Sequence, residues 1–192
     1  MCIRDSAQTV ARIANIFNNN RQFTDAIDVT ECYRLSDTTS VDVNRQNAKA
    51  YCMLKDYKKA IERYESLKRM GDRSFLTFYY LGISYYGDNW FYGSYDNLKE
   101  AYAKNSTDIN VLYYYAKSCS RTSWKKEGVE FMEKAVEIAT PGDSILERLY
   151  KGLAECYGYA GESYKKIEVM NRLYKLNKDY KLFYSCLLYT SP

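Results

Sequence analysis

Apolar residues recur along the chain at steps of three and four positions, the spacing that gathers them on one face of an α-helix. One such segment places on a single face Tyr57, Ala60, Ile61, Tyr64 and Leu67. The charged residues between them fall on the opposite face. Segments with this pattern run for roughly 12 to 15 residues, a length typical of helices rather than strands. The pattern therefore predicts an all-α chain.

Turn-forming residues interrupt this pattern at regular intervals. One set lies near the middle of each predicted helix pair, at residues 18–20, 55–56, 87–89, 122–123 and 161–163. A second set separates successive pairs, at residues 37–40, 71–74, 105–108, 140–144 and 177–179. The separator 140–144 ends at Ser144, and the sequence from Ser144 to Glu147 (SILE) predicts a capping box at the start of the next helix. The chain is thus expected to consist of helix pairs joined by short connections.

The helix pairs repeat with a period of 34 residues. The repeats are 7–40, 41–74, 75–108, 109–142 and, after a four-residue insertion, 147–180. The eighth position of each repeat is small: Ala14, Ala48, Gly82, Ala116 and Ala154. The twentieth position is small in all but the last: Ala26, Ala60, Ser94, Gly128 and Lys166. Large residues dominate the eleventh and twenty-fourth positions. Small side chains at two fixed positions predict that the two helices of a pair approach closely there.

A 34-residue helix-turn-helix unit with this distribution of small and large residues resembles the tetratricopeptide repeat, TPR. The resemblance covers residues 7–180 and implies a right-handed superhelical solenoid of about five antiparallel helix pairs. No repeat has the family's Trp at its fourth position or Pro at its thirty-second. Lys166 at a small-residue position, and Gly93 with Ser94 inside a helix, make the third and fifth repeats the poorest fits.

The resemblance also implies a binding surface, because in TPR proteins the first helix of each repeat lines a concave groove. The candidate binding residues at groove-facing positions are Asn15, Arg45, Lys49, Tyr79, Ile83, Tyr86, Tyr113, Lys117, Arg121, Arg148, Lys151 and Glu155. Tyrosines beside cations suit a peptide or partner helix, and the cations suit an acidic segment or a C-terminal carboxylate. The alternative is that many of the 22 tyrosines fill space between helices and that the cations form an ordinary solvated face.

The composition of the chain excludes or disfavours several classes of function. The 192 residues include no His, which excludes every mechanism that needs an imidazole, and the six Cys show no metal-binding spacing. We find no phosphate-binding loop or catalytic constellation, so no enzyme activity, metal or cofactor is expected. A net charge of +4 with interleaved signs does not predict nucleic-acid binding, and no apolar run reaches the roughly 18 residues of a membrane span. The sequence therefore favours a non-catalytic scaffold that binds a protein or peptide.

A second hypothesis is a glycan-contacting or enzyme-associated helical domain of a larger protein, because such sites combine aromatic side chains with paired carboxylates. The groove-facing carboxylates Asp42 and Glu155 lie in repeats too far apart to share a site, which argues against this hypothesis.

The two ends of the chain look foreign to it. Residues 1–6 (MCIRDS) and 186–192 (CLLYTSP) resemble translated sequencing-adapter sequence of the kind found in bacterial metagenomic fragments. Residues 181–185 are then expected to start a truncated further helix, and the natural chain is expected to extend beyond one or both ends. Whether the protein is cytoplasmic or periplasmic stays open.

Overall fold

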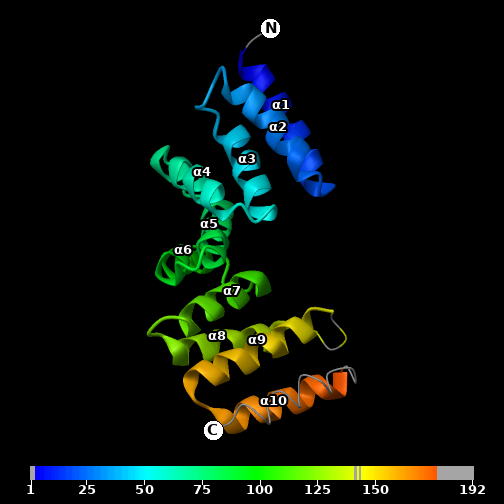
Figure 1. The fold of residues 1–192 in the computed structure, drawn as a ribbon, viewed down its shortest axis with the longest axis vertical. Helices are drawn as coiled ribbons and strands as arrows, with labels where there is room; N and C mark the ends of the chain where they lie inside the picture. The colour runs from blue at the N-terminus through cyan, green and yellow to red at the C-terminus, as the bar shows by residue number, and fades with distance from the viewer. Residues whose placement is uncertain (1–2, 141, 143, 177–192) are drawn as a thin grey trace. The chain divides into compact units, whose positions relative to one another are not determined.

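The described part of the chain is entirely helical in its regular structure. The structure is a computed structural model that describes residues 3–140, 142 and 144–176. The chain divides into two compact units, residues 1–104 and 105–192. The first unit contains α1 (Ile3–Asn19), α2 (Phe23–Arg34), α3 (Val41–Met53), α4 (Tyr57–Arg69), α5 (Phe75–Gly87) and α6 (Phe91–Lys104). The second contains α7 (Ile109–Ser120), α8 (Lys125–Ile138), α9 (Ile145–Ala160) and α10 (Ser163–Leu176). Consecutive helices pack in pairs (Figure 1), so the prediction of an all-α array of helix pairs is confirmed.

Local sequence explains where the helices begin. Helices α3, α5 and α7 start at residues 41, 75 and 109, the first residues of three predicted repeats. Each follows an N-cap residue, Ser40, Ser74 or Asp108, whose side chain accepts a hydrogen bond from a backbone N–H of the first turn. The chain reverses within a pair through a residue of positive φ at the fifteenth position of four repeats: Arg21, Lys55, Asn89 and Gly161.

The small residues of the repeat lie where the two helices of a pair cross. All five residues at the eighth position are buried. Ser94 donates a hydrogen bond of 2.8 Å to the Gly82 carbonyl, and a Cβ atom added to Gly128 would lie 2.8 Å from the Ala116 carbonyl oxygen. The two helices of a pair therefore approach to a distance that only small side chains allow.

Buried tyrosines at the eleventh position connect each of three helix pairs to the pair before it. The Tyr51 hydroxyl lies 3.2 Å from Glu31 Oε1, and the Tyr85 hydroxyl donates to Glu65 Oε1 at 2.8 Å. Tyr157 makes the same contact with Glu133. Each carboxylate comes from the twenty-fifth position of the preceding repeat, so one hydrogen bond recurs at these interfaces. Their burial agrees with the alternative that many of the tyrosines fill space between helices.

Some local predictions need correction. The predicted capping box is wrong, because Ser144 has helical φ and ψ angles of −60° and −18° and its side chain makes no capping hydrogen bond. The glycine and serine at residues 93 and 94 do not interrupt α6, since both are buried against α5. Lys166 is accommodated at its small-residue position because it packs its stem beside Gly158.

The predicted ends fall only partly within the described residues. Residues 3–6, assigned from the sequence to an adapter-derived tail, form the first turn of α1. Residues 1–2, the last four residues of the fifth repeat, the further helix expected at 181–185 and the tail at 186–192 all lie outside the described residues.

Candidate functional site

The candidate binding residues occupy the first helices of the pairs in both units. In the first unit they lie on α1, α3 and α5, and in the second on α7, at Arg121 directly after it, and on α9. The second set consists of Tyr113, Lys117, Arg121, Arg148, Lys151 and Glu155. We call this set, together with the neighbouring Asn110, Glu147 and Tyr159, the α7–α9 surface.

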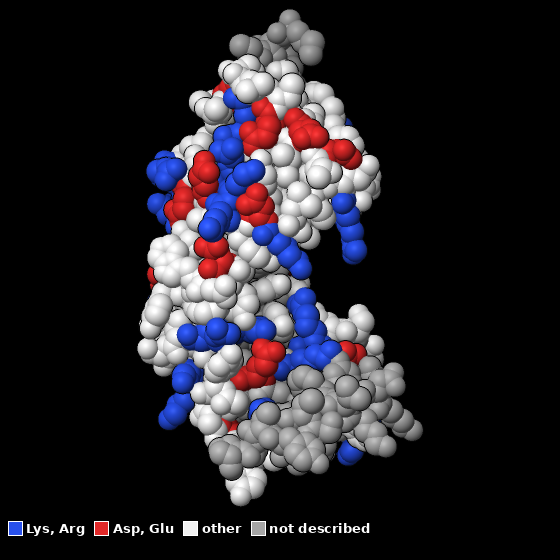
Figure 2. Space-filling model, in the orientation of Figure 1, with Lys and Arg blue, Asp and Glu red and all other residues white. Residues whose placement is uncertain are grey.

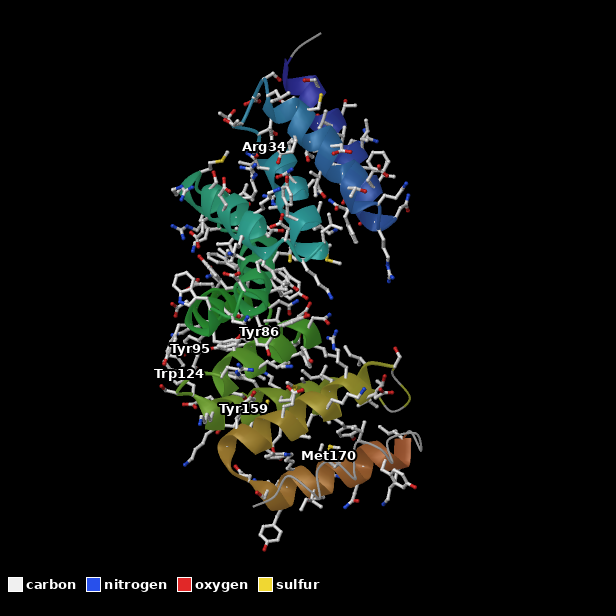
Figure 3. The ribbon with its side chains drawn as sticks, viewed as in Figure 1. Arg34, Tyr86, Tyr95, Trp124, Tyr159 and Met170 are labelled. Atoms are coloured by element: carbon white, nitrogen blue, oxygen red, sulfur yellow. The ribbon has the colours of Figure 1, made fainter. Side chains whose placement is uncertain are left out.

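Three cation–aromatic contacts order the side chains of the α7–α9 surface. The Tyr113 ring has Arg148 Cζ 4.4 Å and Lys117 Nζ 5.6 Å from its centroid. Near the other end of α9 lies Tyr159, which is labelled in Figure 3. Arg121 Cζ lies 5.4 Å from the centroid of this ring, and Arg121 donates a hydrogen bond of 3.1 Å to the Tyr159 hydroxyl. Such contacts fix the planes of the rings and the positions of the cations. The sequence-predicted Tyr113, Lys117, Arg121 and Arg148 are thus brought together on one surface.

Polar contacts orient the remaining charges of this surface. Lys117 Nζ lies 2.8 Å from Glu155 Oε2, and Lys151 Nζ lies 2.8 Å from Glu147 Oε1. Arg148 donates to Asn110 Oδ1 at 2.6 Å, while its Nε atom is buried without a hydrogen-bond partner among the described residues. The four cations of the surface outnumber its two carboxylates, and Figure 2 shows Lys and Arg gathered at this part of the second unit. The surface therefore has a positive balance that an anionic ligand would complement.

In the first unit, the candidate Arg45 is held by two carboxylates. Its Nη1 atom lies 2.9 Å from Asp42 Oδ1, and its Nη2 atom lies 2.9 Å from Asp72 Oδ2. The Asp72 side chain is only 6% exposed. Burial raises the pKa of Asp72, but hydrogen bonds from Thr77, Ser74 and Arg45 outweigh burial and hold this pKa below its usual value. Arg45 therefore links α3 to the turn before α5, and its charge is neutralised within the protein.

Lys49, the other cation among the candidate binding residues of this unit, is partly withdrawn from solvent. Its Nζ atom lies 3.5 Å from Asn19 Oδ1, and burial lowers the pKa of its ammonium group. The candidate Asn15 is exposed and lines a cleft of about 380 Å³ together with residues of α1 and α3. These two residues are separate features of the unit rather than members of one charged cluster.

The aromatic candidates on α5 pack largely against their neighbours. Tyr79 stacks on Phe75 with ring centroids 5.7 Å apart, and Tyr86, which is labelled in Figure 3, meets Phe91 edge-on at 5.5 Å. Both tyrosines are half-buried, and Ile83 packs against the core of the unit. Their rings expose only part of their area, so the surface of α5 combines a packing role with a limited contact area.

The structure offers no support for paired-carboxylate chemistry at the groove positions. Asp42 and Glu155 belong to different units, and each is engaged by a cation. Among the described residues, no group of His, Cys, Asp and Glu side chains is placed to hold a metal ion. The described helices also include none with the length and hydropathy of a membrane span. Sequence reasoning missed Asp72, whose only signal is its position in the turn between two repeats.

Comparisons with known proteins define the class of fold. Neither a scan against protein-family models nor a search of curated proteins finds a match. Among solved structures, the chain has the fold of tetratricopeptide-repeat arrays, which confirms the resemblance at the level of the fold.

Three of these structures illustrate the likeness. MamA from Desulfovibrio magneticus RS-1 is 15% identical, with a TM-score of 0.77 over 94% of this chain and 99% of that one. YrrB, described as a TPR protein with an unusual peptide-binding site, is 15% identical, with a TM-score of 0.76 over 95% of each chain. The TPR-like repeats of a putative kinesin light chain from Podospora anserina are 14% identical, with a TM-score of 0.68 over 91% of this chain and 96% of that one.

Proposed function

We propose that this protein is a non-catalytic interaction scaffold and that its α7–α9 surface binds an acidic peptide segment of a partner protein. The observation that carries the proposal is the set of three cations, Arg148, Lys117 and Arg121, ordered around Tyr113 and Tyr159, with Lys151 on the same helix as Arg148. The structural likeness to TPR proteins, one of which is described as having a peptide-binding site, supports a binding role.

The dimensions of the surface suit a short extended segment. Tyr113 lies in α7 and Arg121 is the residue directly after its end, eight positions further on, which corresponds to about 12 Å along the helix axis. About four residues of an extended peptide cover that length. Acidic side chains of the peptide would meet Arg121 and Lys151 at the two ends, while its apolar atoms would contact the half-buried ring of Tyr113. Charge would set the rate and specificity of capture, and the ring would contribute contact area.

The test measures the fluorescence anisotropy of a labelled octapeptide of alternating Glu and Leu against the full chain. We expect saturable binding that weakens with rising salt, since surface charge attraction is screened. Replacing both end cations, Arg121→Glu with Lys151→Glu, is expected to weaken binding by at least about tenfold. The matched control is Lys59→Glu, which reverses an exposed charge on α4 in the other unit and should leave affinity unchanged.

Two further probes separate the proposal from its alternatives. A peptide of alternating Lys and Leu should bind more weakly than the acidic one. A labelled single-stranded octanucleotide should also bind more weakly, because the proposal requires peptide contacts as well as charge. Undiminished binding of the acidic peptide to the double variant, or tighter binding of the oligonucleotide, would contradict the proposal.

A further inference from the structure

A second cleft lies on the other side of the first unit, between the second helices of two neighbouring repeats. It has a volume of about 790 Å³, with walls formed by α4 and α6 and a floor formed by Phe78 and Tyr85 of α5. We call this feature the outer cleft. It is lined by none of the groove-facing candidate residues, so the function proposed above does not use it.

The outer cleft can be compared with the equivalent place one repeat earlier, because α2 and α4 flank α3 in the same way that α4 and α6 flank α5. At the first of these two places Arg63 crosses between the outer helices. Its Nη2 atom lies 3.2 Å from Glu31 Oε1, and its Nε atom donates to Asn47 Oδ1 at 3.2 Å. The guanidinium group therefore fills the space between α2 and α4 and joins the hydrogen bond between Tyr51 and Glu31.

The outer cleft is open because a shorter residue occupies the equivalent position. Arg63 is the twenty-third residue of its repeat, and the twenty-third residue of the next repeat is Asn97. Asn97 donates to the Gly93 carbonyl of its own helix at 2.8 Å, and Lys68 reaches it from the α4 wall, donating to Asn97 Oδ1 at 3.2 Å. The hydrogen bond from Tyr85 to Glu65 is kept. The interface thus keeps its tyrosine contact, and the Lys68–Asn97 hydrogen bond joins the two walls where a guanidinium group fills the space between α2 and α4, so the cleft stays open.

The two ends of the outer cleft differ in chemistry. At one end are Arg73 and Lys104, which form no ion pair among the described residues, and Lys104 Nζ lies 5.7 Å from the centroid of Phe78. At the other end Trp90 is 56% exposed and meets the ring of Tyr85 edge-on at 4.7 Å. An indole with more than half of its surface in solvent offers an apolar contact that the fold itself does not use.

Charges in the middle of the cleft are of both signs. Glu65 accepts hydrogen bonds from Tyr85 and Lys68, which occupies its carboxylate. The carboxylates of Asp96 and Glu100 line the α6 wall between the two ends, and Lys99 lies beside them. Two cations that form no ion pair among the described residues, Arg73 and Lys104, therefore lie at one end of the cleft. A ligand complementary to the cleft is acidic at one end and apolar at the other.

We propose that the outer cleft binds an extended peptide segment of a partner protein. The segment places an acidic side chain or a C-terminal carboxylate between Arg73 and Lys104, and an apolar side chain on Trp90. Helix α6, which forms one wall, has 14 residues and is therefore about 21 Å long. About six residues of extended chain span this distance. The acidic and apolar residues of the segment are accordingly four to six positions apart.

The experiment selects a ligand from a library of random octapeptides displayed on phage. The bait is the full chain carrying Arg121→Glu and Lys151→Glu, so that a result at the outer cleft is independent of the α7–α9 surface. The most enriched peptide is then synthesised with a fluorescent label, and its dissociation constant is measured by anisotropy. We expect enriched peptides to carry an acidic residue four to six positions from an apolar one.

Two variants of the bait test the cleft in opposite ways. Arg73→Glu with Lys104→Glu reverses the charge of the cationic end, whereas Asn97→Arg supplies the side chain that closes the equivalent space between α2 and α4. Each is expected to weaken binding by at least about tenfold. Lys59→Glu, outside the cleft, should have no effect. Far-UV circular dichroism confirms that each variant is folded. Failure to enrich any peptide, or insensitivity of the selected peptide to either cleft variant, would overturn the proposal.

Discussion

Two glycines of the second unit allow a direct measurement of how closely its helices pack. Gly128 lies at the crossing of α7 and α8, where an added Cβ atom would lie 2.8 Å from the Ala116 carbonyl oxygen and 2.9 Å from the Ser120 backbone nitrogen. Both obstacles are backbone atoms of α7, which cannot rotate away. Gly158 on α9 is the control, because the nearest atom to its added Cβ is the Lys166 side chain at 3.7 Å, an ordinary contact distance.

The same substitution, glycine to alanine, should therefore have opposite effects at the two positions. Alanine is favoured over glycine in a helix by up to about 1 kcal/mol, and Gly158→Ala should gain most of this. At Gly128 the same gain is opposed by an overpacking cost of about 1–3 kcal/mol. Because the helix-propensity contribution is shared, the difference between the two variants isolates the overpacking cost. The Gly128→Ala variant should be less stable than Gly158→Ala by about 1–3 kcal/mol.

Urea unfolding followed by circular dichroism at 222 nm gives both free energies in one assay. Thermal unfolding provides a second measurement, in which each kcal/mol corresponds to about 2–4 °C for a chain of this size. Equal stabilities, or a more stable Gly128→Ala variant, would refute the close approach of α7 and α8 at this crossing. The outcome bears on the whole repeat, since the small residues at equivalent positions of the other repeats are explained by the same contact.

Two further predictions concern titratable groups. The pKa of Asp72 is lowered in the folded state, so Asp72 stabilises the fold above its unfolded pKa of about 3.9, and this contribution is lost as the pH falls through the folded value. The Asp72→Asn variant should lose less unfolding free energy between pH 6 and pH 3 than the unchanged protein, measured by urea unfolding at each pH; an equal loss would show that Asp72 is not stabilised. Burial raises the pKa of Cys52 to about 11, of Cys119 to about 12 and of Cys156 to about 11. Iodoacetamide at pH 8 should therefore modify the exposed Cys32 before these three thiols, as read by peptide mass spectrometry, and faster labelling of any of the three would contradict their burial.

Much of the helical arrangement could be predicted from the sequence because the repeat restricts the same positions several times over. A small residue at a single position predicts little, but small residues at both the eighth and twentieth positions of successive repeats predict a recurring close contact. Gly82 and Ser94 form such a contact, and Gly128 and Ala116 form another. The start of α9 was harder to predict, because the SILE pattern does not decide whether Ser144 adopts the extended geometry that a capping side chain requires.

The candidate site was predicted less well than the fold, for a physical reason. A position in the repeat indicates which side of a helix a residue occupies, but not which side chain of a neighbouring turn reaches it. Arg45 stands at a groove-facing position, yet Asp72 from the turn before α5 binds its guanidinium group. Tyr79 and Tyr86 likewise pack against Phe75 and Phe91, residues whose positions the repeat does not mark as contacts. On α7 and α9, by contrast, the predicted residues lie beside one another, as the spacing of the repeat places them.

In the first unit, the interface between α2 and α4 and the interface between α4 and α6 share one stabilising hydrogen bond but differ in whether a cleft is open between the helices. The tyrosine-to-glutamate hydrogen bond joins neighbouring pairs at both, through Tyr51 and Glu31 at one and Tyr85 and Glu65 at the other. The twenty-third position is not needed for that bond, because the bond persists whether the residue there is Arg63 or Asn97. This position is therefore open to change without loss of the interface, and its side-chain length decides whether the space between the outer helices is filled. If Asn97→Arg leaves the unfolding free energy within about 0.5 kcal/mol of the unchanged protein, the size typical of a substitution that disturbs no specific contact, this separation holds. A large destabilisation would mean instead that Asn97, through its hydrogen bonds with the Gly93 carbonyl and with Lys68 of α4, is part of the structural interface, and that the open cleft is a consequence of packing.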